Sequence, residues 1–456
     1  MRDALSLLNP WWTDPSAWGT APSPLQRRPL RSVAAQAAAA EDPRAALLIG
    51  PRRIGKTTLV KQLLREFASG QRPIPPQNLC YADFQERMLG GVSPEDVVAA
   101  LAKGADERFP LIVALDEIQF VADWDKALRG VVHRWVGPRL RIVATGSGAG
   151  ELRRGAGDTL LDRVALFRLG PMTFPEFETL NGGGPDRPPA EAARLFGEYL
   201  RRGGFPGMSF VPEAHEVARR LREFCETYVL DGDVVRRQGI RQSDALARLW
   251  LHLVRRPGEL LNATQLANEA GAKRDTVDGW LAALQQAELL VAVPPSDRAG
   301  RPTFGKQRYP KGYPVDHALC AAYGAAPDEG PALETLVLRH LAAYAQRSAA
   351  ERAEHVDLSY WNEKSVEGPN EADFRLVAGA RSALIEVKGT TEPGRYARRA
   401  ARVAGLLKKR RAHLVHVGDV REDVRHDGVR VTLWPVVDFA RALEPADAPE
   451  AIFGDE

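Results

Sequence analysis

The chain has 456 residues, 44% of them hydrophobic and 27% charged, which suits a soluble globular protein of about three or four domains. Its formal net charge of +3 excludes a uniformly basic nucleic-acid-binding protein, so any such surface has to be a local patch. The 3 cysteines lie far apart and no apolar run reaches membrane-spanning length, so we expect a cytoplasmic protein without disulfides, zinc or a membrane partner.

Residues 1–41 are rich in proline and tryptophan and form a predicted N-terminal arm. Prolines 10, 15, 22, 24 and 29 exclude a regular strand or a long helix. Trp11, Trp12 and Trp18 bury a large area wherever they dock, so we expect an extended arm packed on the domain that follows. The alternative is an arm that covers the adenine of a nucleotide bound at the next motif.

That motif follows an apolar run at Ala46–Ile49 and has the pattern G-x-x-x-x-G-K-T before a helical pattern. Glycines let successive N–H groups point at a phosphate, and a helix opening at Lys56 adds the positive end of its dipole. Lys56 would reach the β- and γ-phosphates of ATP, and the Thr57 hydroxyl would ligate Mg²⁺. The alternative is a chance glycine turn. The predicted nucleotide-binding residues are Gly50, Pro51, Arg52, Arg53, Ile54, Gly55, Lys56, Thr57 and Thr58.

Two acids follow a second buried strand. A short strand at 79–84 carries Asp83, and a helical pattern over Pro94–Lys103 leads to the apolar run Leu111–Leu115. This run ends in Asp116 and Glu117. Asp116 would hold Mg²⁺, directly or through water, and Glu117 would orient and polarise the attacking water. An ordinary sheet edge is the alternative.

A further strand, Leu140–Ala144, ends in hydroxyl residues where ligands bind in parallel sheets. Thr145 or Ser147 would therefore sense the γ-phosphate or the attacking water, unless they form a plain Gly-Ser turn. Arg163 precedes the next strand, Val164–Leu169. It would reach a neighbouring subunit's nucleotide as an arginine finger, or lie on the surface as an ordinary arginine.

These segments resemble the bacterial and archaeal AAA-type P-loop ATPases that carry a C-terminal domain similar to PD-(D/E)XK nucleases. The resemblance covers nearly the whole chain and rests on GPRRIGKTT (50–58), LIVALDEIQ (111–119), ATGSGAGEL (144–152), LDRVALFRLGPMTFPEF (161–177) and RRGGFPGM (201–208). It implies an α/β fold with an additional-strand (ASCE/AAA-type) P-loop NTPase core at 42–180, a helical lid at 181–243, a winged helix-turn-helix at 244–310 and an α/β restriction-endonuclease-like domain at 311–456. Asp162-Arg163 departs from the usual Gly-Arg near the finger position.

The lid and the winged helix carry candidate phosphate contacts. Gly203-Gly204-Phe205-Pro206 breaks two helical patterns, and Arg201 and Arg202 before it are sensor or surface arginines. In the winged helix, Gly271 makes the turn before a helix at Lys273–Leu284, whose first residues would meet the DNA major groove. A predicted wing follows with Arg298, Arg301, Lys306 and Arg308. The alternative is a winged helix that joins domains or contacts proteins.

In the last domain, PKGYPVDHAL (310–319) matches the family's entering strand, and an acid–acid–lysine set follows. Glu386 and Lys388 lie two apart on one strand and so share a face, and Asp373 lies on the strand before. Asp373 and Glu386 would hold Mg²⁺, Lys388 would stabilise charge on a phosphate or position water, and Glu334 would add a ligand. The alternative is an ordinary Glu–Lys pair. A basic segment that could follow a nucleic-acid backbone contains Arg395, Arg398, Arg399, Arg402 and Lys408–Arg411.

The sequence therefore predicts an AAA-type ATPase that binds and hydrolyses ATP with Mg²⁺, coupled to winged-helix and nuclease-like domains acting on DNA. Arg163 as a finger would imply a homo-oligomer. The competing interpretation is a nucleotide-switched regulatory or scaffold protein whose nuclease fold is an inactive binding module. The presence of Asp373, Glu386 and Lys388 together favours an enzyme.

Overall fold

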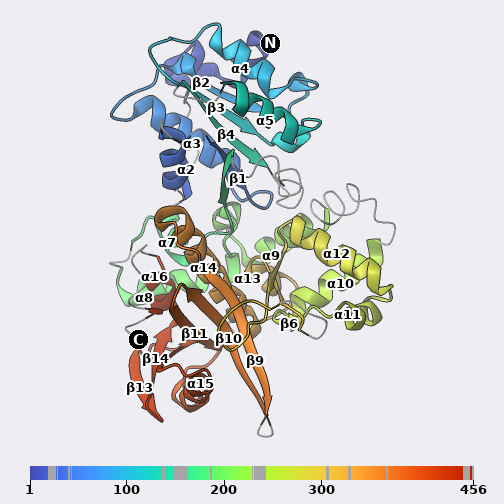
Figure 1. Cartoon of the computed structure of the whole chain (residues 1–456), viewed down its shortest axis with the longest axis vertical. Helices are drawn as coiled ribbons and strands as arrows, with labels where there is room; N and C mark the ends of the chain where they lie inside the picture. Colours follow the sequence, from blue (N-terminus) through green and yellow to red (C-terminus); the bar gives the residue numbers. More distant parts are fainter. Residues whose placement is uncertain are drawn as a thin grey trace. The chain divides into compact units, whose positions relative to one another are not determined.

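The computed structural model describes residues 1–18, 27, 29–39, 42, 44–135, 139–146, 163–184, 187–227, 230, 243–303, 308–326, 330–365, 368–444 and 452–453. The chain divides into two compact units, Met1–Leu169 and Gly170–Glu456 (Figure 1). Among the described residues, the first unit contains a five-stranded sheet and the second contains a six-stranded and a three-stranded sheet.

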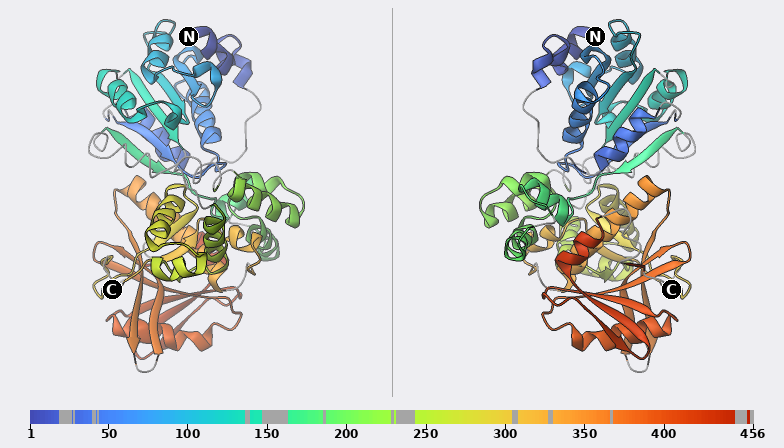
Figure 2. Two further views of the ribbon diagram at one scale, coloured as in Figure 1. Left: turned by 90° about the vertical axis from the view of Figure 1, so that its right-hand side faces the viewer. Right: turned by 90° about the vertical axis from the view of Figure 1, so that its left-hand side faces the viewer.

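The first unit is a parallel sheet with helices on both faces (Figure 2). Its strands are β1 (Ala45–Ile49), β2 (Leu79–Asp83), β3 (Leu111–Asp116), β4 (Leu140–Gly146) and β5 (Val164–Arg168). Its helices are α1 (Arg2–Leu8), α2 (Pro29–Ala38), α3 (Lys56–Ser69), α4 (Pro94–Ala102) and α5 (Trp124–Trp135).

The strand order of this sheet is β2-β3-β4-β1-β5. Every residue of β1, β3 and β4 is buried, because their continuous apolar runs are covered on both faces. The five strands predicted from the sequence are confirmed. Since the strands run parallel, the carboxyl ends of β1, β3 and β4 meet at one edge, where α3 begins.

The N-terminal arm packs on the edge strand β2. The Asn9 side chain donates to the Tyr81 carbonyl at 2.9 Å and accepts from the Tyr81 N–H at 2.6 Å, so it replaces a neighbouring strand. Trp11 and Trp12 donate their indole N–H groups to the Leu79 carbonyl at 3.1 and 2.8 Å. The tryptophans thus pack on the first unit, as expected. The arm is not extended, however, because it folds into α1, α2 and the 3₁₀ turns η1 (Pro10–Trp12) and η2 (Pro15–Trp18).

A mixed six-stranded sheet forms the C-terminal part of the second unit. Its strands are β9 (Asp357–Ser365), β10 (Gly368–Ala378), β11 (Arg381–Lys388), β12 (Arg411–His416), β13 (Glu422–His426) and β14 (Val429–Pro435). β9, β10 and β11 form an antiparallel meander, β11, β12 and β14 run parallel, and β13 pairs antiparallel at the far edge. The β9–β10 register shifts between Ala372 and Arg375, so the irregularity includes Asp373 and Phe374.

Helices cover this sheet. α14 (Gly330–Arg352) precedes the meander, α15 (Gly394–Leu406) connects β11 to β12, and α16 (Val436–Ala442) follows β14. Alanines of α15 share an apolar cluster with Leu384 of β11 and Leu414 of β12, which places these residues on one face. His413, beside Leu414, points to the other face, where its Nδ1 accepts from Trp434 at 2.9 Å.

The second unit also contains a smaller sheet with three helices. These are α10 (Ser243–Arg255), α11 (Ala263–Ala270) and α12 (Arg274–Gln286), with β6 (Glu259–Leu260), β7 (Leu290–Val293) and β8 (Lys311–Pro314) in the order β6-β8-β7. The helices α11 and α12, and the turn at Gly271 (φ 69°) between them, lie where the sequence predicts the helix-turn-helix. β8 pairs with β6 and β7. The segment 310–319 was expected to contain the strand that enters the last domain. Its strand β8 pairs with the smaller sheet, and the domain boundary at 311 stays a prediction.

The segment after β7, predicted as a DNA-contacting wing, is tied to the six-stranded sheet where the structure describes it. Pro295 forms a parallel bridge with Tyr360 of β9, and the Arg298 guanidinium lies 2.7 Å from the Glu363 carboxylate of the same strand. Arg298 therefore faces a carboxylate of its own unit, and a DNA contact by this segment stays a prediction. Lys306 lies outside the described residues.

A helical subdomain contains the segment predicted as a lid. Its helices are α7 (Phe174–Leu180), α8 (Pro189–Arg202), α9 (Ala214–Glu223) and α13 (His317–Ala322). α8 ends at Gly203, whose φ of 71° and ψ of −165° are essentially restricted to glycine, so the predicted helix break is confirmed. A Cβ at Gly203 would lie 2.3 Å from Asp316 Oδ1, and Asp316 Oδ2 accepts from the Gly204 N–H at 2.7 Å. The lid role stays a prediction.

Gly203→Ala is expected to lower the free energy of unfolding of the second unit by about 3 kcal/mol, because the backbone is strained and the carboxylate must move. Gly207→Ala is the matched control: that glycine lies four residues on, is exposed, and no atom lies within 4 Å of an added Cβ. Urea unfolding measures both. Equal stabilities for the two variants would contradict the tight approach of Asp316.

Candidate nucleotide and metal sites

The two glycines of the G-x-x-x-x-G-K-T motif act differently. Gly55 has φ 96° and ends the loop as the N-cap of α3. Gly50, which the structure describes, does not have a positive φ. A Cβ added to it would lie 2.2 Å from the Leu169 carbonyl oxygen. Leu169 follows β5 and donates its N–H to the Ile49 carbonyl at 2.8 Å. Gly50 is therefore required by a close backbone approach, and the expected curling role applies to Gly55.

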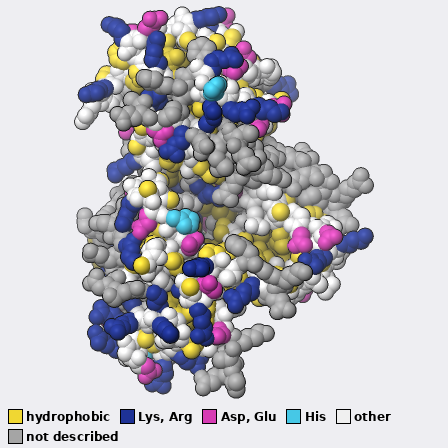
Figure 3. Space-filling view, viewed as in Figure 1, with side chains coloured by type: hydrophobic (Ala, Val, Ile, Leu, Met, Phe, Trp, Pro, Cys, Tyr) yellow, Lys and Arg dark blue, Asp and Glu magenta, His cyan; other side chains and the backbone are white. Residues whose placement is uncertain are grey.

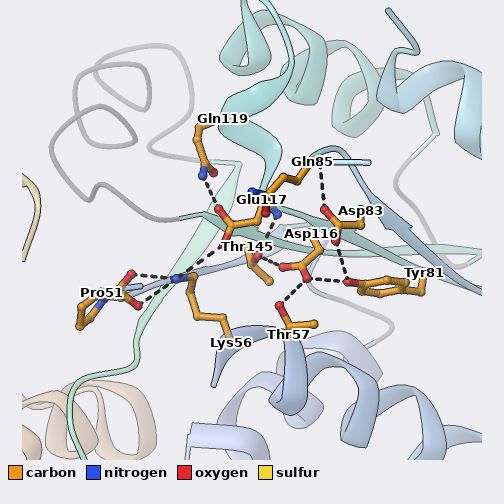
Figure 4. A network of polar contacts seen from close by, with 11 residues as sticks. Pro51, Lys56, Thr57, Tyr81, Asp83, Gln85, Asp116, Glu117, Gln119 and Thr145 are labelled. Carbon is orange, nitrogen blue, oxygen red and sulfur yellow. Dashed lines mark hydrogen bonds and ion pairs between the residues drawn. The ribbon is translucent and has the colours of Figure 1, made fainter. Parts of the chain in front are cut away.

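Lys56 is buried in its own loop. Its Nζ donates to the carbonyls of Gly50 and Pro51, each at 3.0 Å, and lies 3.9 Å from Glu117 Oε1. A buried ammonium needs such oxygens, and a phosphate would offer it stronger, charged acceptors. The lysine is thus held at the centre of the loop, between the backbone of β1's end and the acid that follows β3 (Figure 4).

Asp116 is the centre of a hydrogen-bond network at the edge where β1, β3 and β4 end (Figure 4). Its Oδ2 accepts from the Thr57 hydroxyl at 2.6 Å and from the Tyr81 hydroxyl at 2.8 Å. Its Oδ1 accepts from the Thr145 hydroxyl. The structure therefore brings together Thr57, Asp116 and Thr145, which the sequence placed on three separate segments.

Tyr81 is a site residue that the sequence reasoning missed. It lies on β2, two residues before Asp83, and its hydroxyl is also 3.4 Å from Asp83 Oδ2. Burial and the charge of Asp116 raise the pKa of Tyr81, so its phenol stays a proton donor to the carboxylate. Burial raises the pKa of Asp83. The available signal was the period of two, which puts Tyr81 and Asp83 on one face of β2.

Glu117 follows Asp116 directly and contacts the same network through Thr145. Its φ of 51° is left-handed, which is uncommon outside glycine and occurs where a site holds the backbone in place. Its N–H donates to Thr145 Oγ1 at 3.1 Å, and its carboxylate accepts from the Gln119 side chain. Thr145 thus orients the backbone of Glu117 as well as the carboxylate of Asp116.

Three further residues of the first unit lie near the site or were predicted to belong to it. Arg163 Nη1 lies 3.2 Å from His133 Nδ1 of α5, and its role as a finger stays a prediction. Ser147 lies outside the described residues. Arg27, which the sequence reasoning did not select, is buried and donates to the carbonyl of Ile54 in the phosphate loop at 3.4 Å.

A second cluster lies in the six-stranded sheet of the second unit. Lys388 Nζ lies 2.8 Å from Glu386 Oε1 and 3.4 Å from Asp373 Oδ2, and it donates to the Val387 carbonyl at 2.8 Å. Asp373 Oδ2 also accepts from the Val387 N–H at 2.8 Å, which fixes it against β11. Oxygens of three residues thus converge on one cation. The structure brings together Asp373, Glu386 and Lys388, as the sequence predicted.

Burial and mutual repulsion perturb the acids of this cluster. Burial, then the charge of Asp373, raises the pKa of Glu386 to about 7. The same two causes raise the pKa of Glu334, on α14, to about 8, and Tyr313 donates to Glu334 at 2.9 Å. Burial lowers the pKa of Lys388, but the carboxylates outweigh it and raise the pKa overall.

The described residues contain no group of three or more His, Cys, Asp or Glu side chains arranged to hold a metal ion. Glu334 is therefore not placed as the third carboxylate ligand that the sequence suggested. A cation held by Asp373 and Glu386 would need other oxygens, and the Val387 carbonyl lies at the same place. Two hard carboxylates and a carbonyl suit Mg²⁺ or Mn²⁺.

The predicted basic segment lies on and after α15. Of its residues, Arg395, Arg398, Arg402, Lys408 and Arg410 are exposed. Figure 3 shows Lys and Arg side chains gathered on the part of the second unit that α15 and β13 form. At the start of α12, exposed Lys273 and Arg274 stand beside exposed Asp275, so that surface has mixed charge.

Comparison with known families supports the class of the first site. Residues 42–178 match the model of a family described as an AAA domain, and this segment is an AAA-type P-loop ATPase domain. Residues 193–329 match a family described as a domain of unknown function (DUF8612). The match includes the three-stranded sheet, and the description of that family gives it no role.

Two further comparisons give distant likenesses. An uncharacterized protein of Haemophilus influenzae (strain ATCC 51907 / DSM 11121 / KW20 / Rd) is 25% identical over 268 residues, covering 56% of this chain and 63% of that protein. This chain therefore spans less than two thirds of the length of that relative.

Among the described residues, no helix is both long and apolar enough to cross a membrane.

Solved structures with some likeness include the Aeropyrum pernix ORC1 protein in complex with DNA, at 15% identity and a TM-score of 0.31, covering 70% of this chain and 96% of that chain. AMPPCP-bound DnaA from Aquifex aeolicus has 15% identity and a TM-score of 0.25, covering 53% and 81%. C. elegans PCH-2 has 18% identity and a TM-score of 0.26, covering 36% and 48%. Because these TM-scores lie below 0.5, these structures do not establish the fold or the role of this chain.

Proposed function

We propose that the chain is a Mg²⁺-dependent ATPase whose second unit carries a metal-dependent phosphodiesterase site acting on nucleic acid. The observation that supports the ATPase best is the network of Thr57, Asp116 and Thr145 beside Lys56. A hydroxyl and a carboxylate 2.6 Å apart are hard oxygen donors that suit Mg²⁺. The direct test is phosphate release from ATP by the full chain, which should stop when EDTA removes the metal.

The residues of the first site have separate roles in this proposal. Lys56 would exchange its backbone carbonyls for the β- and γ-phosphates, and Thr57 and Asp116 would hold the metal. Bound Mg²⁺ would neutralise charge on the phosphates. Glu117 accepts a hydrogen bond from the attacking water and takes up its proton, and Gln119 and the Thr145 contact orient that acid.

The proposal for the second unit rests on the convergence of Asp373, Glu386 and the Val387 carbonyl on the Lys388 ammonium. The order α14, three antiparallel strands, α15 and a parallel strand supports the predicted restriction-endonuclease-like fold. Bound Mg²⁺ or Mn²⁺ would polarise a phosphodiester there. Asp373 and Glu386 would hold the cation, and Lys388 would move toward the phosphate oxygen.

A second candidate function is favoured by one observation: the described residues offer two carboxylates, not three, for a metal. On that interpretation, the cluster is a binding module and nucleotide state switches protein contacts. The winged-helix role of α10, α11 and α12 belongs to either proposal. The docked segment after β7 supports a winged helix that joins parts of the second unit.

Mn²⁺ affinity of the second unit is expected to be about tenfold higher at pH 8 than at pH 6. Glu386 must lose its proton to bind the metal, and its pKa of about 7 means that the carboxyl is mostly neutral at pH 6 and mostly charged at pH 8. Calorimetry in two buffers of different ionisation enthalpy would measure the affinity and the released proton. An affinity independent of pH would contradict Glu386 as a ligand.

A further inference from the structure

The helix α15 brings an arginine to the acid–acid–lysine cluster. Leu384 lies in the apolar cluster with the α15 alanines, and the period of two puts Glu386 on the same face of β11 as Leu384. Arg399 lies on α15 between Ala397 and Ala400, both buried in that cluster. Its positive charge acts on Glu386 and lowers the pKa of that carboxyl against the larger effect of burial.

Arg399 differs from the neighbouring arginines of the basic segment. Its side chain is half-buried, and its Nε atom is buried without a hydrogen-bond partner among the residues that the structure describes. Arg398, one residue before it, is exposed to solvent. A buried guanidinium N–H without an acceptor is costly unless a ligand supplies one.

Two lysines, Lys388 in the cluster and Lys311, on which the charge of Asp373 acts, are already paired with carboxylates. Lys388 lies between Asp373 and Glu386, and Lys311 forms an ion pair with Glu371. A phosphodiester that arrived beside a metal at Asp373 and Glu386 would still carry negative charge. Guanidinium groups match the paired oxygens of a phosphate, and Arg399 has donor capacity left to meet them.

We propose that Arg399 is a phosphate-binding residue of the C-terminal site and holds a non-bridging phosphate oxygen beside Glu386 and Lys388. This inference rests on the proposed phosphodiesterase function. It separates Arg399 from the exposed arginines of α15, which were grouped with it by sequence. The ligand class is a phosphodiester of nucleic acid, and free inorganic phosphate shares its chemistry.

The test uses the full chain with Lys56→Ala, so that phosphate does not bind the first unit's loop. Mn²⁺ is loaded first and its affinity measured by calorimetry. Inorganic phosphate and the dinucleotide TpT are then titrated, and Mn²⁺-induced broadening of their ³¹P lines reports binding next to the metal. Arg399→Ala should weaken phosphate binding about tenfold or more while Mn²⁺ affinity stays within about threefold.

Two further variants sharpen the result. Arg398→Ala, on the same helix, should leave the ³¹P titration unchanged, and Arg399→Lys should restore part of the affinity because it returns a charge without the planar fork. TpT affected like phosphate identifies a phosphodiester site, whereas phosphate alone affected identifies a free-anion site and overturns the nucleic-acid assignment. If Mn²⁺ binds but Arg399→Ala equals Arg398→Ala, the inference on Arg399 fails alone. If Mn²⁺ does not bind the parent, both it and the phosphodiesterase proposal fail.

Discussion

Glu117→Gln should bind ATP as tightly as the parent and lose about 100-fold or more of its turnover. The glutamine keeps the shape of the side chain and can still contact Gln119, but it cannot take a proton from water. Lys56, Thr57 and Asp116, which hold the nucleotide in this proposal, are unchanged. The measurements are phosphate release in Mg²⁺ and the affinity for a fluorescent ATP analogue.

Controls separate catalysis from folding and from binding. Glu107→Gln makes the same change at an exposed position of the first unit and should hydrolyse ATP at the parent's rate. Lys56→Ala should lose nucleotide binding itself, because it removes the buried cation at the centre of the loop. A Glu117→Gln protein that turns over at the parent's rate would sink the assignment of Glu117 as the general base.

The parallel sheet of the first unit was predictable because its signal is local. Runs such as Leu111–Leu115 are uniformly apolar, and a strand buried on both faces needs no alternation. The residues at the ends of these strands, Asp116 and Thr145, could be selected because parallel strands bring their carboxyl ends to one edge. The sequence could not show that Thr57 and Tyr81 donate to the same oxygen, since these contacts join separate elements.

The features that prediction missed or misjudged depend on distant parts of the chain. Asn9 bonds to Tyr81, 72 residues away, and nothing near Asn9 indicates a strand edge. Gly203 looked like a helix break, but Asp316 is what excludes a side chain there. The ion pair of Arg298 could not be predicted, because Glu363, its partner, lies 65 residues on. Charge runs predict exposure, and only the fold distinguishes Arg399 from Arg398.

Asp373→Asn is expected to abolish both Mn²⁺ binding by the second unit and any nucleic-acid cleavage, while ATP turnover stays at the parent's level. Asparagine can still accept the Val387 N–H, so the variant should fold, but it removes one of two carboxylate charges that the cation needs. Glu386→Gln should behave alike. Asp419→Ala, at an exposed acid of the same unit, is the control.

The readouts distinguish an enzyme from a binding module. Calorimetry with Mn²⁺ needs no substrate and should show a loss of about 100-fold or more in affinity for Asp373→Asn. Lys388→Ala should keep metal binding and lose cleavage. Removing the ammonium leaves both carboxylates free to bind the metal, but nothing then stabilises the charge on the phosphate. Cleavage would be assayed on single- and double-stranded DNA and RNA, with and without ATP. Millimolar Mn²⁺ that binds neither the parent nor Asp373→Asn would mean that Lys388 is the permanent cation of this cluster, and the second unit would then be a nuclease-shaped binding module.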